Sequence, residues 1–321
     1  MHARLVLARA VTVAVRYTAI RRQFRDRDGD GTGPEMAVLD YPTVQIRLLP
    51  LLATAFALHY SGEAMKNLYQ QTRKTVSAGD FSALADLHST SSGLKSLCTT
   101  LTVDGIEVCR RALGGHGFGS GSGLVQIKND YSAKPTVEGD NWMITQQVAS
   151  YLIKKTASAV KSGANSKPTD ETDKGLKDYL RFKSSKDTST IDIFKGDEEI
   201  VAAFQKRAAH FSYKAYENRI VKKRSWNELL IQLHQLSEAQ SQATLVTNFY
   251  LAISSPEGLS KGSKDILTKL LRLFALYTMD NQARQCRAPS NMHFRVSTNT
   301  PLTLHSFLLW CSLQRAAGST T

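Results

Sequence analysis

Two short stretches of this sequence carry residue types that could bind or transform a ligand. The first follows Arg110 and Arg111 and holds six glycines from Gly114 to Gly123 without a proline; we call residues 114–123 the glycine turn. Guanidinium groups bind phosphates bidentately, and glycines let a backbone lie close to a large ligand. The second is the step EGDN at residues 138–141, about two dozen residues further on, which places two carboxylates just before a predicted helix. The residues alone fit a ligand site, and they also fit a helix–loop–helix with ordinary caps.

The elements that must position these stretches are predicted to be helices, because apolar residues recur at helical spacing and few segments alternate as strands do. Pro42 suits the first turn of the second helix, and Pro50 predicts a kink in it. The small residues at 89–93 favour a close helix crossing over the approach of a ligand. The predicted helices cover residues 5–24, 41–72, 81–113, 141–161, 197–223, 226–254 and 260–283.

Composition limits the classes of protein that the chain can belong to. With 321 residues, of which 42% are hydrophobic and 21% charged, it can bury a sizeable core and is not expected to be disordered. The formal net charge of +13 implies attraction to phosphates, but no zinc, helix-turn-helix or stacking motif points to nucleic acid. The four cysteines show no metal-binding spacing, so we expect free thiols and no metal site.

Two segments are similar to known functional motifs, a targeting segment and a calcium-binding loop. Arginines at positions 4, 9 and 16 interrupt the apolar N-terminal run, so we expect a core helix there and neither a targeting segment nor a membrane span. Residues 26–33 are similar to a calcium loop but lack a carboxylate at the twelfth position, so we predict an ordinary loop.

Several motifs occur in an order that resembles the acyl-CoA oxidase family, a branch of the acyl-CoA dehydrogenase and oxidase superfamily. The most specific is CRRALGGHGF at residues 109–118, followed by the EGDN step and a helix with two adjacent glutamines at 146–147. Upstream of it stand AVRY at 14–17, RRQF at 21–24, LDYP at 39–42 and LLPLLA at 48–53. The resemblance extends over about residues 3–284, which is most of the chain.

The resemblance implies an all-α chain of two helical bundles, equivalent to the C-terminal helical half of an acyl-CoA oxidase. The family's N-terminal helical domain and β-barrel domain have no counterpart here, so we expect a truncated form. The polar, proline-containing segment after the fourth predicted helix is the best boundary. We expect a bundle over residues 1–163, a linker over 164–175, a second bundle over 176–284 and a divergent tail over 285–321.

The resemblance also implies an activity. Acyl-CoA oxidases remove two hydrogens from the α and β carbons of an acyl-CoA, giving a trans-2-enoyl-CoA, with FAD as cofactor and molecular oxygen reduced to hydrogen peroxide. This reaction belongs to fatty acid β-oxidation in the peroxisome. Residence there is implied by the family alone, because the chain does not end in S-K-L.

Site residues follow from the matched motifs. The family's catalytic base corresponds to Glu138, beside which Gly139 leaves room for a thin substrate. Arg21, with Arg22 as a near alternative, matches the arginine that reaches the flavin dinucleotide of a partner subunit, so a homodimer is implied. The residues that match the cofactor-binding helix end are Arg111, Gly114 and Gly115.

Other functions stay open at this point. An acyl-CoA dehydrogenase shares the fold and the glutamate but passes its electrons to another flavoprotein. A non-catalytic helical protein that dimerises through the same surfaces is the rival from another class. A basic nucleic-acid binder is a distant third.

Overall fold

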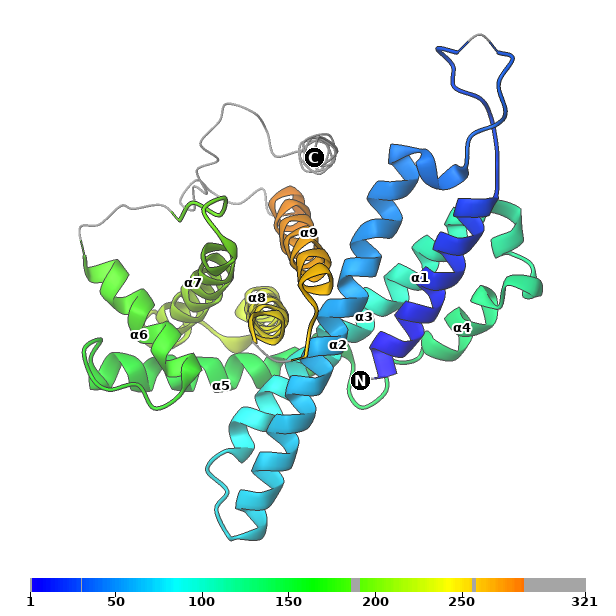
Figure 1. Ribbon diagram of the computed structural model, residues 1–321. Coiled ribbons are helices and arrows are strands. Elements are labelled where there is room, and N and C mark those ends of the chain that lie inside the picture. The colour runs from blue at the N-terminus through cyan, green and yellow to red at the C-terminus, as the bar shows by residue number, and fades with distance from the viewer. Residues whose placement is uncertain (1, 30, 186–190, 256–257, 286–321) are drawn as a thin grey trace.

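The computed structural model describes residues 2–29, 31–185, 191–255 and 258–285. Over these residues the chain folds as helices, with an isolated antiparallel bridge between Arg22 and Ala37, which confirms the all-α prediction (Figure 1). The α-helices are α1 (His2–Ile20), α2 (Pro42–Ser77), α3 (Leu84–Ala112), α4 (Leu124–Tyr131), α5 (Asn141–Ser162), α6 (Glu171–Ser184), α7 (Asp197–Tyr216), α8 (Trp226–Ser254) and α9 (Lys261–Gln285). Short 3-10 segments are η1 (Val38–Asp40), η2 (Gly114–Gly117) and η3 (Ser120–Ser122), and a π-helical turn, η4 (Glu217–Val221), follows α7.

The largest apolar core joins the N-terminal helices to the C-terminal ones. Fully buried side chains in it come from α1 (Leu7), α2 (Leu48), α3 (Ile106), α8 (Leu245) and α9 (Leu271). Helix α8 packs against α2, α3, α5, α7 and α9, which explains why apolar residues surround it on most sides. The N-terminal helices therefore rest directly on the C-terminal ones.

The crossing of α3 over α8 depends on small residues, as the sequence predicts for residues 89–93. A Cβ added to Gly93 would lie 2.5 Å from Ser241 Oγ and 3.6 Å from Val148 Cγ2. Ser89, Ser92 and Ser96 are buried on the same helix. These residues let the two backbones approach closely.

Three elements, α1, α4 and α6, differ from the prediction. Helix α1 ends at Ile20 rather than near residue 24, because Gln23 and Phe24 exchange backbone hydrogen bonds with Met36. Helix α4 was not predicted. Helix α6 begins at Glu171, inside the predicted linker 164–175, because Asp170 accepts from the Asp173 amide at its N-terminus and a buried Lys177–Asp173 ion pair of 2.7 Å stabilises its first turns.

Some sequence predictions concern parts of the chain that the structure does not describe. The predicted tail from residue 286 onward, with Cys286 and Cys311, lies outside the described residues.

Within the described residues, Cys98 and Cys109 are free thiols. No helix among the described residues is both long and apolar enough to cross a membrane.

Candidate active site and phosphate-binding end

The predicted base Glu138 lies in the loop that leads into α5; we call residues 135–141 the Glu138 loop. Glu138 is exposed, and its φ of 61° is in the left-handed region, which non-glycine residues rarely adopt. Gly139 follows with a φ of 98°. Asp140 caps α5, because its Oδ1 accepts from the Trp142 amide at 2.9 Å. The capping role therefore falls to Asp140, and the Glu138 carboxylate is left to project from the loop.

Lys95 of α3 donates hydrogen bonds to the Glu138 loop from the side on which the loop faces α3. Its Nζ donates to the carbonyl oxygens of Gly139 at 2.6 Å and Pro135 at 3.2 Å, and to Asn141 Oδ1 at 2.9 Å. Burial lowers the pKa of Lys95, whereas the nearby carboxylates of Glu138 and Asp140 raise it. Sequence analysis missed Lys95; the only signal was a cation that follows a run of small residues.

The glycine turn begins where α3 ends. Gly114 has a φ of 59°, and an added Cβ at Gly114 or Gly115 would meet no atom within 4 Å, so both glycines face open space. Gly117 differs, since an added Cβ would lie 1.9 Å from the Arg110 carbonyl oxygen. Two of these glycines thus leave room for an approaching ligand, and the third permits the turn to fold against α3.

Three cations surround one carboxylate beside the glycine turn. Glu107 accepts from Arg110 Nη2 at 2.7 Å, from Arg111 Nε at 2.7 Å and from Lys128 Nζ at 2.5 Å. The bonds from Arg110 and then Lys128 hold the pKa of Glu107 well below its usual range. The side chain of Arg111 stays 70% exposed. The group carries excess positive charge, which favours a phosphate.

Arg21 lies at the same end of the molecule as the glycine turn. The Arg21 amide donates to Tyr17 O at 2.8 Å, and Tyr17 OH bonds His116 Nδ1 of the turn at 2.9 Å. The exposed guanidinium of Arg21 donates to Gln23 Oε1 at 2.8 Å. Arg22 instead donates to the carbonyl oxygen of Glu35 at 2.9 Å, within a segment that extends away from the helices (Figure 1).

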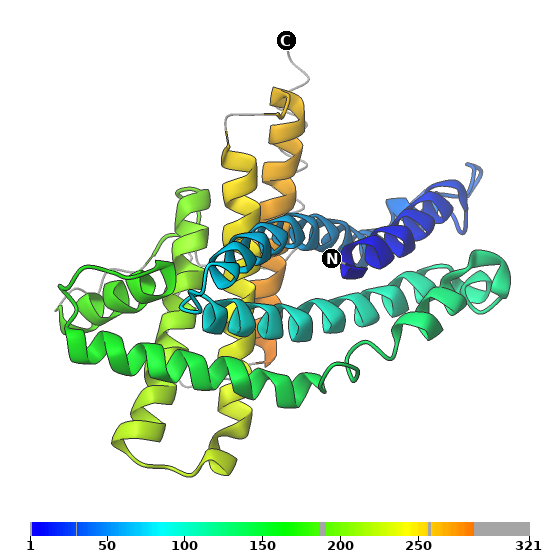
Figure 2. The ribbon, with the colours of Figure 1, turned by 90° about the horizontal axis from the view of Figure 1, so that it is seen from below.

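The structure does not bring Glu138 together with the glycine turn. Lys95 and Arg111 are both on α3, and at 1.5 Å per residue they are separated by about 24 Å along its axis. Figure 2 shows α4 and α5 beside α3, with the Glu138 loop between them. The site therefore has two ends, a carboxylate end and a phosphate-binding end.

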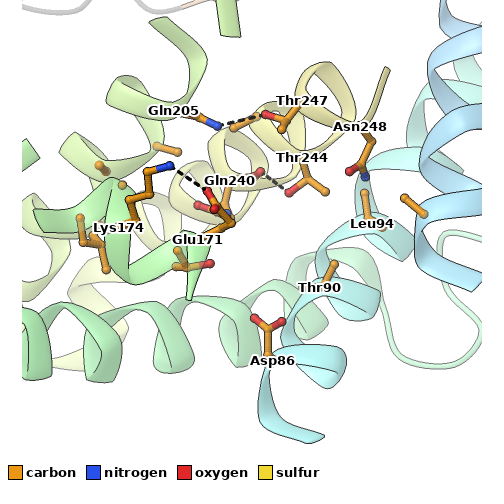
Figure 3. A pocket seen from close by; sticks show the side chains of 18 of the residues that line it. Asp86, Thr90, Leu94, Glu171, Lys174, Gln205, Gln240, Thr244, Thr247 and Asn248 are labelled. Atoms are coloured by element: carbon orange, nitrogen blue, oxygen red, sulfur yellow. Dashed lines mark hydrogen bonds and ion pairs between the residues drawn. The ribbon is translucent and has the colours of Figure 1, made fainter. Parts of the chain in front are cut away.

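A cavity of about 430 Å³ lies elsewhere, between α2, α3, α6, α7 and α8. Figure 3 shows Asp86 and Thr90 on one side of it and Lys174 with Glu171 on another. Its polar side chains partly bond one another, as Gln205 Nε2 does with Thr247 Oγ1 at 3.4 Å. The predicted site residues do not line it. Over the described residues, no group of three or more metal-ligating side chains is found.

Comparison with known proteins agrees with the resemblance seen in the motifs. Residues 1–153 match the model of the acyl-CoA oxidase C-alpha1 domain, and residues 197–299 match a second acyl-CoA oxidase model. Peroxisomal acyl-coenzyme A oxidase 1 of Arabidopsis thaliana is 35% identical over 276 residues, which are 85% of this chain and 40% of that protein. The Homo sapiens protein of the same name is 31% identical over 293 residues, covering 86% of this chain and 42% of that one.

Solved structures show the same similarity in three dimensions. Acyl-CoA oxidase 1 of Arabidopsis thaliana superposes with a TM-score of 0.78 at 34% identity, over 88% of this chain and 42% of that one. Acyl-CoA oxidase-1 of Caenorhabditis elegans, solved in complex with FAD and ATP, gives a TM-score of 0.77 at 29% identity, over 89% of this chain and 42% of that one. The fold places the chain with the helical domains of these acyl-CoA oxidase structures. It belongs to the acyl-CoA oxidase family, and it spans about 40% of the length of the relatives it matches.

Proposed function

We propose that this chain supplies the catalytic base and part of the flavin-binding surface of an acyl-CoA oxidase, which converts an acyl-CoA to a trans-2-enoyl-CoA in peroxisomal fatty acid β-oxidation. The observation that carries the proposal is the exposed carboxylate of Glu138 on a loop bonded to α3. The matched relatives are named peroxisomal acyl-coenzyme A oxidases, which supports the location and the substrate class.

In this proposal Glu138 accepts the α-proton of the acyl-CoA. That proton is weakly acidic, so the carboxylate must be held against it and shielded from water. The Glu138 loop provides the first requirement through its bonds to α3. Glu138 is exposed over the residues described, so we assign the second requirement to the part of the longer relatives that this sequence does not match.

The residues at the glycine turn fit FAD. Gly114 and Gly115 face open space, and Arg111 exposes most of its side chain beside a group of excess positive charge, as a diphosphate requires. When bound, FAD supplies the acceptor for the hydride from the β carbon, and molecular oxygen is the final acceptor. Arg21 and Arg111 would hold the diphosphate and adenosine half.

The separation of the two ends supports a homodimer. Because the carboxylate end and the phosphate-binding end lie about 24 Å apart along α3, one chain can offer its base to one flavin and its arginines to the flavin of a partner subunit.

The matches to residues 1–153 and 197–299 support the proposed division into bundles over 1–163 and 176–284.

The proposal is tested with the chain alone and with the same chain joined to the part of the Arabidopsis relative that it does not match, which we call the joined protein. Alone, it should be helical by circular dichroism, hold little FAD and form no peroxide from saturated acyl-CoAs. Val137, Trp142 and Met143 expose 41%, 60% and 65% of their surface around the Glu138 loop, so the isolated chain should also aggregate.

The joined protein should contain flavin and form peroxide. Absence of flavin from it would overturn the proposal and favour the non-catalytic helical protein. Flavin reduction by acyl-CoA without peroxide formation would indicate the acyl-CoA dehydrogenase alternative. Stoichiometric flavin and turnover in the chain alone would show that no further domain is needed.

A further inference from the structure

We propose that Lys95 is a positioning residue for Glu138, holding the backbone on both sides of it against α3 so that the carboxylate projects in one direction. The proposal rests on the function proposed for Glu138. It assigns a role to a residue of α3 that contributes no atom to the predicted reaction.

The bonds of Lys95 match the capacity of its side chain. An ammonium group has three N–H donors. Three acceptors surround Lys95 Nζ: Gly139 O at 2.6 Å, Asn141 Oδ1 at 2.9 Å and Pro135 O at 3.2 Å. Pro135 lies before Glu138 and Gly139 lies after it, so a single ammonium group fixes both sides of the residue.

The backbone at Glu138 needs such support. Glu138 and Gly139 are consecutive residues with φ of 61° and 98°, and a glutamate in the left-handed region costs free energy that surrounding bonds must offset. Inside the loop, the Asn141 amide donates to Pro135 O at 2.9 Å. Lys95 binds the same carbonyl oxygen and joins this closed turn to α3.

The third acceptor of Lys95 is itself fixed on α3. Asn141 is 6% exposed, and the two N–H groups of its Nδ2 have three acceptors within reach, Ser96 O at 3.0 Å, Thr99 Oγ1 at 3.0 Å and Thr100 Oγ1 at 2.9 Å. With Nδ2 turned toward α3 in this way, Oδ1 is left to accept from Lys95. The C-terminal side of the Glu138 loop is therefore held against α3 where Lys95 binds it.

The charge of Lys95 is not neutralised by these acceptors, which are all uncharged. Its positive charge therefore acts on the carboxylates of Glu138 and Asp140 by Coulomb attraction. An apolar residue at position 95 would remove both the bonds and the charge.

The test measures amide hydrogen exchange by mass spectrometry on the 321-residue chain, for the wild type, Lys95→Met, Lys95→Arg and the control Lys154→Met on the exposed face of α5. Bonds to a charged donor are strong, so Lys95→Met should speed exchange over residues 135–144 by about tenfold to a hundredfold. Exchange in α1 and α2 should not change. Lys95→Arg, which keeps a charged donor, should restore most of the protection, and Lys154→Met should match the wild type.

Unchanged exchange over residues 135–144 in Lys95→Met would overturn the inference, and so would equal acceleration throughout the chain. If Lys95→Met does not fold, Lys95→Gln replaces it. Its neutral and shorter side chain should also speed exchange over residues 135–144, and unchanged exchange in this variant would overturn the inference. In the joined protein, Lys95→Met should lower the limiting rate of flavin reduction about tenfold while the half-saturating acyl-CoA concentration stays the same. The base role is tested separately by Glu138→Gln, so failure of that role and failure of this inference give different results.

Discussion

The cations at the two ends of α3 have different hydrogen-bond partners. At the Glu138 loop, one partly buried cation, Lys95, is fully bonded to uncharged acceptors and holds a carboxylate outward. At the glycine turn, three cations share one carboxylate, Glu107, and open space adjoins Gly114 and Gly115. These arrangements support the proposal that the first end presents a carboxylate of the chain and that the second binds a negative group of a ligand.

This difference explains how one helix can serve two parts of a reaction. A base needs a defined position, because a proton transfer depends on geometry. A phosphate-binding surface needs charge and access, since most of its binding energy comes from charge-assisted bonds. In the proposed function, bonds from Lys95 to backbone carbonyl groups meet the first need, and the glycines and arginines of the turn meet the second.

The largest effect should come from removing the base. In the joined protein, Glu138→Gln should lower the rate of flavin reduction by acyl-CoA about 10²–10⁴-fold or more while flavin content stays the same, because an amide of the same shape cannot accept the α-proton. Anaerobic bleaching of the flavin measures it. Asp140→Asn, which alters the cap of α5 two residues away, is the matched control and should retain reduction. An undiminished rate of flavin reduction in Glu138→Gln would show that Glu138 is not the base and that the carboxylate end does not have the proposed role.

The carboxylate end also depends on the close approach of α3 to α8. Gly93→Leu, two residues from Lys95, should lower the free energy of unfolding by about 1–3 kcal/mol, because the added side chain meets Ser241 and Val148. Urea unfolding measures it. The control is Gly175→Leu in α6, where an added Cβ meets no atom within 4 Å; it should not destabilise the chain. Equal unfolding midpoints for Gly93→Leu and wild type would contradict the close crossing.

At the phosphate-binding end, Arg21→Glu should weaken FAD retention in the joined protein about tenfold, through the loss of one charge-assisted bond. Lys222→Glu reverses a charge in a surface group, where Lys222 pairs with Glu217 at 3.4 Å, and should retain flavin. Flavin absorbance of the purified variants compares them. Equal loss in both would mean that Arg21 acts only through the overall charge of the protein.

The smallest effect concerns the carboxylate among the three cations. Since the pKa of Glu107 is lower in the folded protein than in the unfolded chain, its ionised form stabilises the fold above about pH 4.3, and this contribution is lost as the pH falls toward the lowered value. Glu107→Gln should therefore reduce stability by about 1 kcal/mol at pH 7, and the gap should narrow below about pH 4. Urea unfolding at several pH values measures it. Glu228→Gln, at an exposed pair with Arg224, is the control and should leave the stability close to that of the wild type.

Local patterns predicted much of this protein. Helical spacing of apolar residues placed α8 at Trp226–Ser254 with its observed bounds, and the glycines at 114 and 115 marked the end of α3. Helix α4 was missed because its eight residues lie close after six glycines, where a short periodic pattern is hard to distinguish from a turn. Helix α6 was also missed, because its first turn is so polar that it resembles a linker.

The sequence by itself determined the seven longest helices, the family and the residues proposed to act as base or to bind phosphate, because spacing and motif order are local properties of the chain. The tertiary structure decided which of these residues meet. Lys95 and Gly139 are 44 positions apart and bond only because α5 packs beside α3. Likewise, Lys128 reaches Glu107 because α4 returns along α3, and the length of α3 separates Lys95 from Arg111 by about 24 Å along the helix axis. Contacts between distant positions depend on how helices pack, which no local pattern specifies.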